Sequence, residues 1–143
     1  MDHLINIRNA VRLDVHSIIR LAGQLSESVH IDQQHLIANF ETHVVDDRYC
    51  LLVATVNENI VGYVSAFFHH AIYANGEVAY VDEIVVDRLH RDSKVGTELM
   101  LRFEEIAKKR RCILVSLATF GAKAFYEKLG YSSKAGYFKK YLV

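Results

Sequence analysis

The sequence contains no proline and only two cysteines among its 143 residues. Without proline, the boundaries of helices and strands must be predicted from Gly, Asn, Asp and the hydrophobic period. Cys50 and Cys112 each lie in an apolar run, so we expect two buried, reduced thiols. This excludes a small scaffold held together by disulfides.

The chain also lacks a net charge, because 17 Lys and Arg balance 17 Asp and Glu. A protein without a cationic field is not expected to bind nucleic acid in general. The charge is nevertheless uneven along the chain. Residues 1–70 carry 4 basic and 8 acidic side chains, whereas residues 71–143 carry 13 and 9, so we expect an anionic ligand to bind the second half.

Long hydrophobic runs are missing as well. No 18 consecutive apolar residues occur, and residues 1–8 do not resemble a cationic leader followed by an apolar stretch. We therefore expect a cytoplasmic protein with no membrane partner. A hydrophobic fraction of 51% and a charged fraction of 24% are typical of a globular protein, and the length fits one domain over residues 1–143.

Hydrophobic periodicity predicts an α/β domain with the element order β-α-α-β-β-β-α-β-α-β. Asp14 and Asp32 are the expected helix caps, and Asn57, Glu58 and Asn59 the expected hairpin turn. The predicted strands are 4–8, 49–56, 60–68, 79–86, 112–117 and one or two within 131–142. The predicted helices carry apolar stripes at Val15, Ile18, Ile19, Ala22 and Leu25, at Leu36, Ile37, Phe40 and Val44, at Val95, Leu99, Phe103 and Ile106, and within 121–129.

The most informative stretch is 81–97, in which an apolar strand leads through a basic loop into a helix. The first turn of a helix exposes unpaired N–H groups and a partial positive charge, which suits phosphate. Arg91 and Lys94 add charge there, and Gly96 allows a close approach to the backbone. An ordinary loop with solvated charges explains the same features. A P-loop is excluded, because the spacing Gly-x-x-x-x-Gly-Lys-Ser/Thr does not occur.

Three segments resemble the GNAT superfamily of acetyl-CoA-dependent N-acetyltransferases. The loop is similar to the family motif Arg/Gln-x-x-Gly-x-Gly/Ala, with Arg91 first, Gly96 last and Lys94 in place of the middle glycine. Residues 122–131 are similar to the family helix that ends in Phe-Tyr-x-Lys-Leu-Gly-Phe/Tyr, and 59–64 to its third strand, where Gly62 suggests a bulge. Thr119 occupies the position of a frequent family asparagine.

The resemblance implies a single-domain GNAT-like fold: a mixed, mainly antiparallel twisted sheet of six to seven strands flanked by about four helices. It also implies acetyl-CoA as co-substrate and no metal. Backbone groups of Ile84 and Val86 would bind the pantetheine arm. The full set of implied cofactor contacts is Ile84, Val85, Val86, Arg91, Asp92, Ser93, Lys94, Val95, Gly96, Thr97, Thr119, Ala122 and Phe125.

Catalytic roles follow from the same likeness. Asp82 and Glu83 are similar to the acidic pair that serves as base in small-amine acetyltransferases, and strand alternation sends them to opposite faces, so only one can point at a given pocket. Asp82 is favoured and Glu83 is kept; a surface ion pair is the structural alternative. Tyr126 matches the tyrosine that protonates the departing thiolate, although a packing role is common for such a residue.

The histidines give weaker evidence for a functional site. His69 and His70 follow one another in a strand and therefore diverge, so a metal site is not expected. By resemblance, His70 and Tyr73 are the candidate acceptor contacts.

The basic run 108–111 is interpreted as a solvated helix end and not as a nucleic-acid patch. It closes an amphipathic helix, where cations interact favourably with the C-terminal dipole.

The implied reaction is acetyl transfer from acetyl-CoA to the primary amine of a small molecule, by direct attack in a ternary complex. A non-catalytic CoA-binding sensor or degenerate partner domain, and acetylation of a protein or peptide amine, stay open as alternatives. The aminoalkylphosphonate acetyltransferases are a further resemblance, since their motif can also lack the middle glycine. The resemblance also allows a homodimer.

Overall fold

The sheet has the strand order β1-β2-β3-β4-β5. The computed structural model describes residues 4–25 and 30–143. In chain order, the elements are β1 (Ile5–Asn9), the 3-10 turn η1 (Arg12–Asp14), α1 (Val15–Ala22), α2 (Gln33–Val45), β2 (Tyr49–Val56), β3 (Asn59–Ala71), η2 (Ile72–Ala74), β4 (Gly76–Val86), η3 (Arg88–His90), α3 (Val95–Lys109), β5 (Leu114–Leu117) and α4 (Lys123–Lys128).

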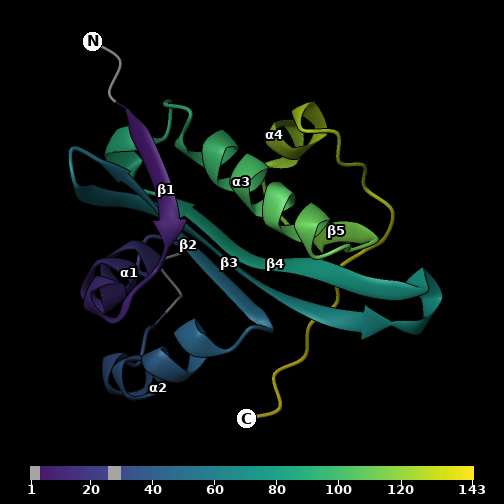
Figure 1. The fold of residues 1–143 in the computed structure, drawn as a ribbon, viewed down its shortest axis with the longest axis horizontal. Helices are drawn as coiled ribbons and strands as arrows, with labels where there is room; N and C mark the ends of the chain where they lie inside the picture. Colours follow the sequence, from purple (N-terminus) through teal and green to yellow (C-terminus); the bar gives the residue numbers. More distant parts are fainter. Residues whose placement is uncertain (1–3, 26–29) are drawn as a thin grey trace.

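Strands β1 to β4 pair antiparallel, and β5 joins β4 in parallel. The expected mixed, mainly antiparallel α/β sheet is thus confirmed. The expected strand count is wrong, because the described residues form a 5-stranded sheet and 131–143 contain no strand. Aromatic residues, in which this segment is rich, indicate strand propensity only, and a strand forms only where its backbone pairs with that of a neighbouring strand. Figure 1 shows this C-terminal segment leaving α4 and running past the sheet to the α2 side.

Helices cover both faces of the sheet, with α3 and α4 on one side and α1 and α2 on the other (Figure 1). One buried cluster joins the sheet to α3, including Leu99, Met100 and Phe103, which are fully buried. A second cluster joins the opposite face to α1 and α2 through Leu21 and Tyr63. Within the described residues, no helix is long and apolar enough to cross a membrane.

The N-terminal helices differ in detail from the sequence prediction. Asp32 does cap α2, since its carboxylate accepts a hydrogen bond from the His35 N–H at 3.0 Å. Asp14 makes no such cap; its buried carboxylate accepts two hydrogen bonds from Arg8, at 2.8 and 3.0 Å, and one from the Val11 N–H. Helix α1 ends at Ala22, so Leu25 lies beyond it, and Ile37 of the α2 stripe is exposed.

The β2–β3 hairpin turns where the sequence predicts. Asn57 and Glu58 have φ of 51° and 68°, the left-handed pair of a tight hairpin turn. A register shift follows, in which Ile60 pairs Thr55 and Gly62 pairs Ala54, so the expected bulge lies next to Gly62. Cys50 is buried and Cys112 is only half-buried; both are free thiols.

Candidate active site

The parallel strands β4 and β5 separate halfway along β4. Their pairing runs from Val78 opposite Leu114 to Val81 opposite Leu117, and β4 then continues to Val86. Within the part of the chain that the structure describes, the last five residues of β4 have no strand on this side. The backbone of 82–86 therefore borders an opening in the sheet.

A β-bulge lies where the strands separate. On β3, Ser65 pairs Glu83 and the next residue, Ala66, pairs Val81, so Asp82 is the extra residue of β4. The bulge shifts the alternation of β4 by one residue. Ala79 and Val81 belong to the α3-side cluster before it, and the even-numbered Ile84 and Val86 pack against that same cluster after it.

The prediction that Asp82 and Glu83 point to opposite faces is therefore wrong. Before the bulge, Tyr80 and the residue two positions later, Asp82, face the α1/α2 side. After the bulge, Glu83 faces the same side as Val85, which is buried in the α1/α2-side cluster. Strict alternation fails because a bulge places two residues opposite one. The two carboxylates are neighbours, and the charge of Glu83 acts on Asp82.

The two acids have different surroundings. Glu83 is half-buried and its Oε2 accepts a hydrogen bond of 2.5 Å from the hydroxyl of Tyr63, whose ring is fully buried. Asp82 is exposed and makes no hydrogen bond or ion pair with any described residue. Partial loss of hydration, and then the charge of Glu83, raise the pKa of Asp82 above its ordinary value.

The basic loop connects β4 to α3 and is fixed by two contacts at its β4 end. Arg20 of α1 forms an ion pair with Asp87 at 2.8 Å, and this hydrogen bond holds the pKa of Asp87 below its ordinary value. Arg91 Nε donates to the Val86 carbonyl at 3.2 Å. Among the described residues, no carboxylate forms an ion pair with Arg88, Arg91 or Lys94, so these cations remain available to a ligand.

Lys94 precedes the first turn of α3 with φ −83° and ψ 16°. Any L-residue adopts this conformation, so the lysine in the motif's middle glycine position introduces no backbone strain. Helix α3 begins at Val95, and the N–H groups of its first turn have no acceptor inside the helix. The neighbouring Asp92 and Ser93 are exposed, and the Ser93 hydroxyl donates to the His90 carbonyl.

Gly96 brings α3 close to α4. A Cβ at this position would lie 3.4 Å from the Phe125 ring and 3.7 Å from Val86 Cγ2, so the glycine marks where β4, α3 and α4 meet. Ala122 and Phe125 pack against the α3-side core. Thr119, in the place of the family asparagine, accepts a hydrogen bond from the Ala122 N–H at 3.3 Å and so supports the start of α4.

Tyr126 is buried on α4, with its ring edge-on to those of Phe125 and Tyr131 at 5.0 and 5.8 Å. Burial raises the pKa of its phenol, so the hydroxyl keeps its proton throughout the neutral range. No described residue accepts or donates a hydrogen bond at this hydroxyl. Its proton is therefore free for another acceptor.

The open edge of β4 presents specific backbone groups. The Asp87 N–H donates to the Val61 carbonyl on β3, whereas the Val86 carbonyl faces Arg91 on the other side. Because backbone groups of successive residues point to alternate edges of a strand, Ile84 and Val86 share the open side, and Val85 points toward β3. These groups suit an extended ligand bearing amides, and α3 lies next to them to receive phosphate.

Two sequence-predicted residues lie elsewhere. His70 pairs with Glu77, and Tyr73 lies in η2 at the far end of the β3–β4 hairpin, which projects from the body in Figure 1. Glu77 precedes Asp82 by five residues, which is roughly 17 Å of strand. The structure therefore does not bring His70 and Tyr73 together with the other candidates. Among the described residues, no three His, Cys, Asp or Glu side chains are grouped as metal ligands.

Sequence reasoning missed Tyr63 and Arg20. Tyr63 follows Gly62 in an apolar strand and has the pattern of a core residue, and only the β3–β4 register reveals its carboxylate partner. Arg20 is separated from Asp87 by 67 positions. Neither has a local signal that could have identified it.

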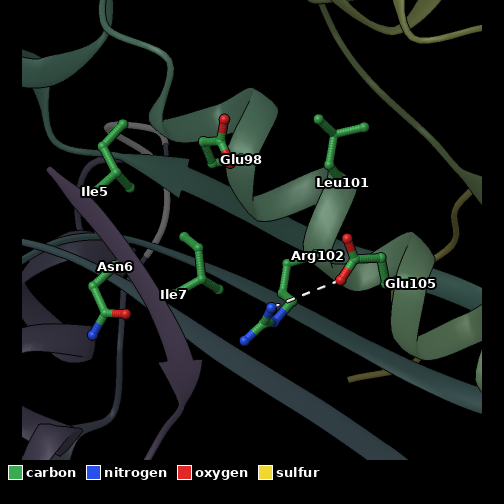
Figure 2. A pocket seen from close by; sticks show the side chains of 7 residues that line it. All are labelled: Ile5, Asn6, Ile7, Glu98, Leu101, Arg102 and Glu105. Carbon is green, nitrogen blue, oxygen red and sulfur yellow. Dashed lines mark ion pairs between the residues drawn. The ribbon is translucent and has the colours of Figure 1, made fainter.

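Two surface hollows lie apart from these residues. One, of about 280 Å³, lies between β1 and α3, where Arg102 forms an ion pair with Glu105 at 3.7 Å (Figure 2). Its lining is Ile5, Asn6, Ile7, Glu98, Leu101, Arg102 and Glu105. The other, of about 370 Å³, lies between the end of α2, the start of β2 and the end of α3. Neither contains a sequence-predicted site residue.

Comparison with known proteins agrees with this geometry. Residues 15–131 match the family model described as "Acetyltransferase (GNAT) family". The aminoalkylphosphonate N-acetyltransferase of Salmonella typhimurium is 26% identical over 140 residues, which cover 95% of this chain and 90% of that protein.

Solved structures share the fold at lower identity. The glucosamine-6-phosphate N-acetyltransferase of Arabidopsis thaliana superposes with a TM-score of 0.86 at 24% identity, over 98% of this chain and 99% of its own. A transcriptional regulator from Bacillus halodurans gives 0.85 at 22% identity, over 97% and 100%. With the family model spanning most of its length, the chain belongs to the GNAT family of acetyltransferases, enzymes that use acetyl-CoA as co-substrate.

Proposed function

We propose that this enzyme transfers the acetyl group of acetyl-CoA to the primary amine of a small molecule, by direct attack in a ternary complex. Asp82 is the base, acting directly or through one water, and Tyr126 is the proton donor to the thiolate. The observation that carries this proposal is the opening between β4 and β5, which begins at Asp82 and continues beside the start of α3.

Three features support the binding of acetyl-CoA at this opening. Ile84 and Val86 offer backbone N–H and C=O groups to the amides of the pantetheine arm. The first turn of α3 offers N–H groups to the pyrophosphate, with Val95, Gly96 and Thr97 as donors. The cations of Arg91 and Lys94 are exposed and free of carboxylate partners.

The hydrogen bonds of the two acids favour Asp82 over Glu83 as base. The Glu83 carboxylate is held by the Tyr63 hydroxyl, whereas that of Asp82 has no partner among the described residues. A raised pKa also makes Asp82 a stronger base than a free aspartate. In this mechanism Asp82 removes the ammonium proton, and the neutral amine attacks the thioester carbonyl.

Collapse of the tetrahedral intermediate breaks the carbon–sulfur bond and releases a thiolate. Tyr126 is protonated at neutral pH and has a free hydroxyl, so it can give its proton to the sulfur. The attacking nitrogen also loses its second proton to water, and Asp82 gives the ammonium proton to solvent. The amide and the free CoA thiol are then both neutral at their reacting atoms. Tyr126 recovers its proton from solvent.

Calorimetric titration with acetyl-CoA tests the site first. We expect micromolar binding by the wild type and a loss of at least about tenfold in Arg91→Ala. Arg102→Ala should cause no change, because Arg102 is an exposed arginine of α3 that lines the hollow of Figure 2. A thiol-release assay with a panel of amines follows, using Asp82→Asn and Tyr126→Phe.

The outcomes separate the alternatives. Turnover with small amines that falls in Asp82→Asn and Tyr126→Phe supports the proposal. Tight acetyl-CoA binding without turnover of any amine or peptide indicates the non-catalytic sensor, and turnover of peptides alone indicates a protein acceptor. No binding at millimolar acetyl-CoA overturns the proposed site.

A further inference from the structure

A row of aromatic side chains crosses the sheet beside Asp82. In the strand register, Tyr49 of β2 is opposite Phe67 of β3, and Phe67 is opposite Tyr80 of β4. The Phe67 and Tyr80 ring centroids are 5.5 Å apart, and His69 stacks on Phe67 at 5.3 Å. We call Phe67, Tyr80 and His69 the aromatic platform.

The platform lies on the same face as the two acids. Tyr63 is four residues before Phe67 on β3 and is buried in the α1/α2-side cluster, whereas Ala66 and Phe68 belong to the opposite cluster. Phe67 therefore faces the α1/α2 side, as does Tyr63, the partner of Glu83. Phe67 and Tyr80 are only half-buried, so their rings keep exposed area.

The C-terminal segment adds a wall to this platform. Burial, and then the charges of Tyr137 and Asp82, raise the pKa of the Tyr80 phenol, so both residues interact electrostatically with Tyr80. The Tyr137 ring also packs edge-on against Phe120, with centroids 6.3 Å apart. The segment that forms no strand thus brings Tyr137 to the acidic face.

The charges at this surface are negative. Asp82 and Glu83 lie at one end of the platform, two and three residues after Tyr80. Within the described residues, no lysine or arginine makes a hydrogen bond or ion pair with any platform residue, with Asp82 or with Glu83. An anionic group bound beside Asp82 would therefore face two carboxylates, whereas the charge of Lys139 interacts with Tyr137, on the wall of the platform.

Resting on the proposed function, we propose that the acceptor is an arylalkylamine: a primary amine joined by a short linker to an aromatic ring. The ring packs on Phe67 and Tyr80 beside Tyr137, and the amine lies at Asp82. Tyr80 and Asp82 are two strand residues apart, which corresponds to about 7 Å. An aromatic ring with a two-carbon linker to the amine can cover this distance. Phe67 and Tyr80 are then the residues that determine acceptor specificity.

Physical complementarity favours this class over two others. An aminoalkylphosphonate carries its anion to the side of the two acids, where like charges repel. An aliphatic diamine satisfies the acids but buries little of the platform, whereas a ring covers aromatic area by offset or edge-on packing. The arylalkylamine uses both the acids and the rings.

Initial rates of thiol release with 2-phenylethylamine, 2-aminoethylphosphonate and 1,4-diaminobutane at saturating acetyl-CoA test the inference. We expect kcat/KM to be highest for 2-phenylethylamine by at least about tenfold. Phe67→Leu keeps apolar volume but removes the ring, and it should raise KM for 2-phenylethylamine several-fold with little change for 1,4-diaminobutane. Tyr80→Ala should do the same, and Tyr80→Phe should restore most of the lost affinity.

Phe138→Ala is the matched control, because Phe138 is the neighbour of Tyr137 and is 94% exposed; it should leave all three rates unchanged. Acetyl-CoA titration and thermal melting of each variant verify that the cofactor site and fold are intact. A higher kcat/KM for the phosphonate or the diamine, or acetyl-CoA binding with no 2-phenylethylamine turnover, overturns the arylalkylamine inference and leaves the acetyl-CoA site standing. Failure to bind acetyl-CoA instead overturns the proposed function itself.

Discussion

The hydroxyl of Tyr63, a fully buried residue of β3, donates a hydrogen bond of 2.5 Å to Glu83, the residue that follows the bulge of β4. This contact engages one of two adjacent carboxylates and leaves the other free. A bulge that places both acids on one face thus also gives them different roles: Glu83 is anchored to the core, and Asp82 is available for proton transfer.

Tyr63→Phe should act through Glu83. Removing the hydroxyl should lower the free energy of unfolding by about 1 kcal/mol, and it should change kcat/KM by the same factor as Glu83→Gln. In the double variant we expect no further loss, because the two residues form one unit. Tyr131→Phe is the control, since it removes a similar tyrosine–carboxylate hydrogen bond, to Glu104 at 2.8 Å. Additive effects on kcat/KM would show that Tyr63 does not act through Glu83.

Asp82 should set the acidic limb of the rate profile. The base must be deprotonated, so kcat/KM should fall as the pH drops through the raised pKa of Asp82, at a pH above that of an ordinary aspartate. Glu83→Gln removes the negative charge of Glu83, which is the second cause of the raised pKa of Asp82, and should therefore move this limb to lower pH. A limb that stays in place would contradict the assigned base.

Asp82→Asn should separate catalysis from stability. A raised folded-state pKa means that ionised Asp82 is less favourable in the folded than in the unfolded state, so its charge costs stability above the unfolded-state pKa and costs nothing below it. We therefore expect kcat to fall by about 10² or more while the Tm at pH 7 is unchanged or higher. A lower Tm with unchanged kcat would instead indicate a structural acid.

Lys94→Gly restores the glycine of the family motif but should not improve the enzyme. Lys94 already has a negative φ, so glycine relieves no strain and removes one free cation from the loop. We expect weaker acetyl-CoA binding by about threefold to tenfold in calorimetry, with Lys94→Ala behaving alike. Tighter binding by Lys94→Gly alone would show that the lysine strains the loop.

Gly62→Ala should disturb the contact between the sheet and α3. The new Cβ would lie 2.9 Å from the Val85 carbonyl oxygen and 3.1 Å from Val95 Cγ1 at the start of α3. We expect a loss of about 1–3 kcal/mol in urea unfolding, together with weaker acetyl-CoA binding. Gly136→Ala is the control, because its Cβ meets only Phe138, at an ordinary 3.6 Å. Equal stability of the two variants would contradict the close packing.

Local signals in the sequence were sufficient for most elements. The hairpin at Asn57 and Glu58, the cap at Asp32 and the strand, loop and helix over 81–97 depend on neighbouring residues, so composition and period predict them. Arg91 and Gly96 lie at the β4–α3 junction for the same reason, because strand, loop and helix follow one another directly. Phe125 meets Gly96 from α4, through a contact between distant segments.

Pairing between distant segments decided the rest. The bulge at Asp82 exists only in the register of β4 against β3, and it reverses the faces that alternation predicts. The same register gives Tyr63 its carboxylate partner and aligns Phe67 with Tyr80. The C-terminal residues are rich in aromatic side chains, as strands are, yet they form no strand, and Tyr137 interacts with Tyr80 instead. Sequence alone determined which residues with catalytic or binding chemistry the chain contains. Tertiary structure decided which of them share a face of the sheet, because a single-residue shift in strand pairing reverses the direction of every later side chain.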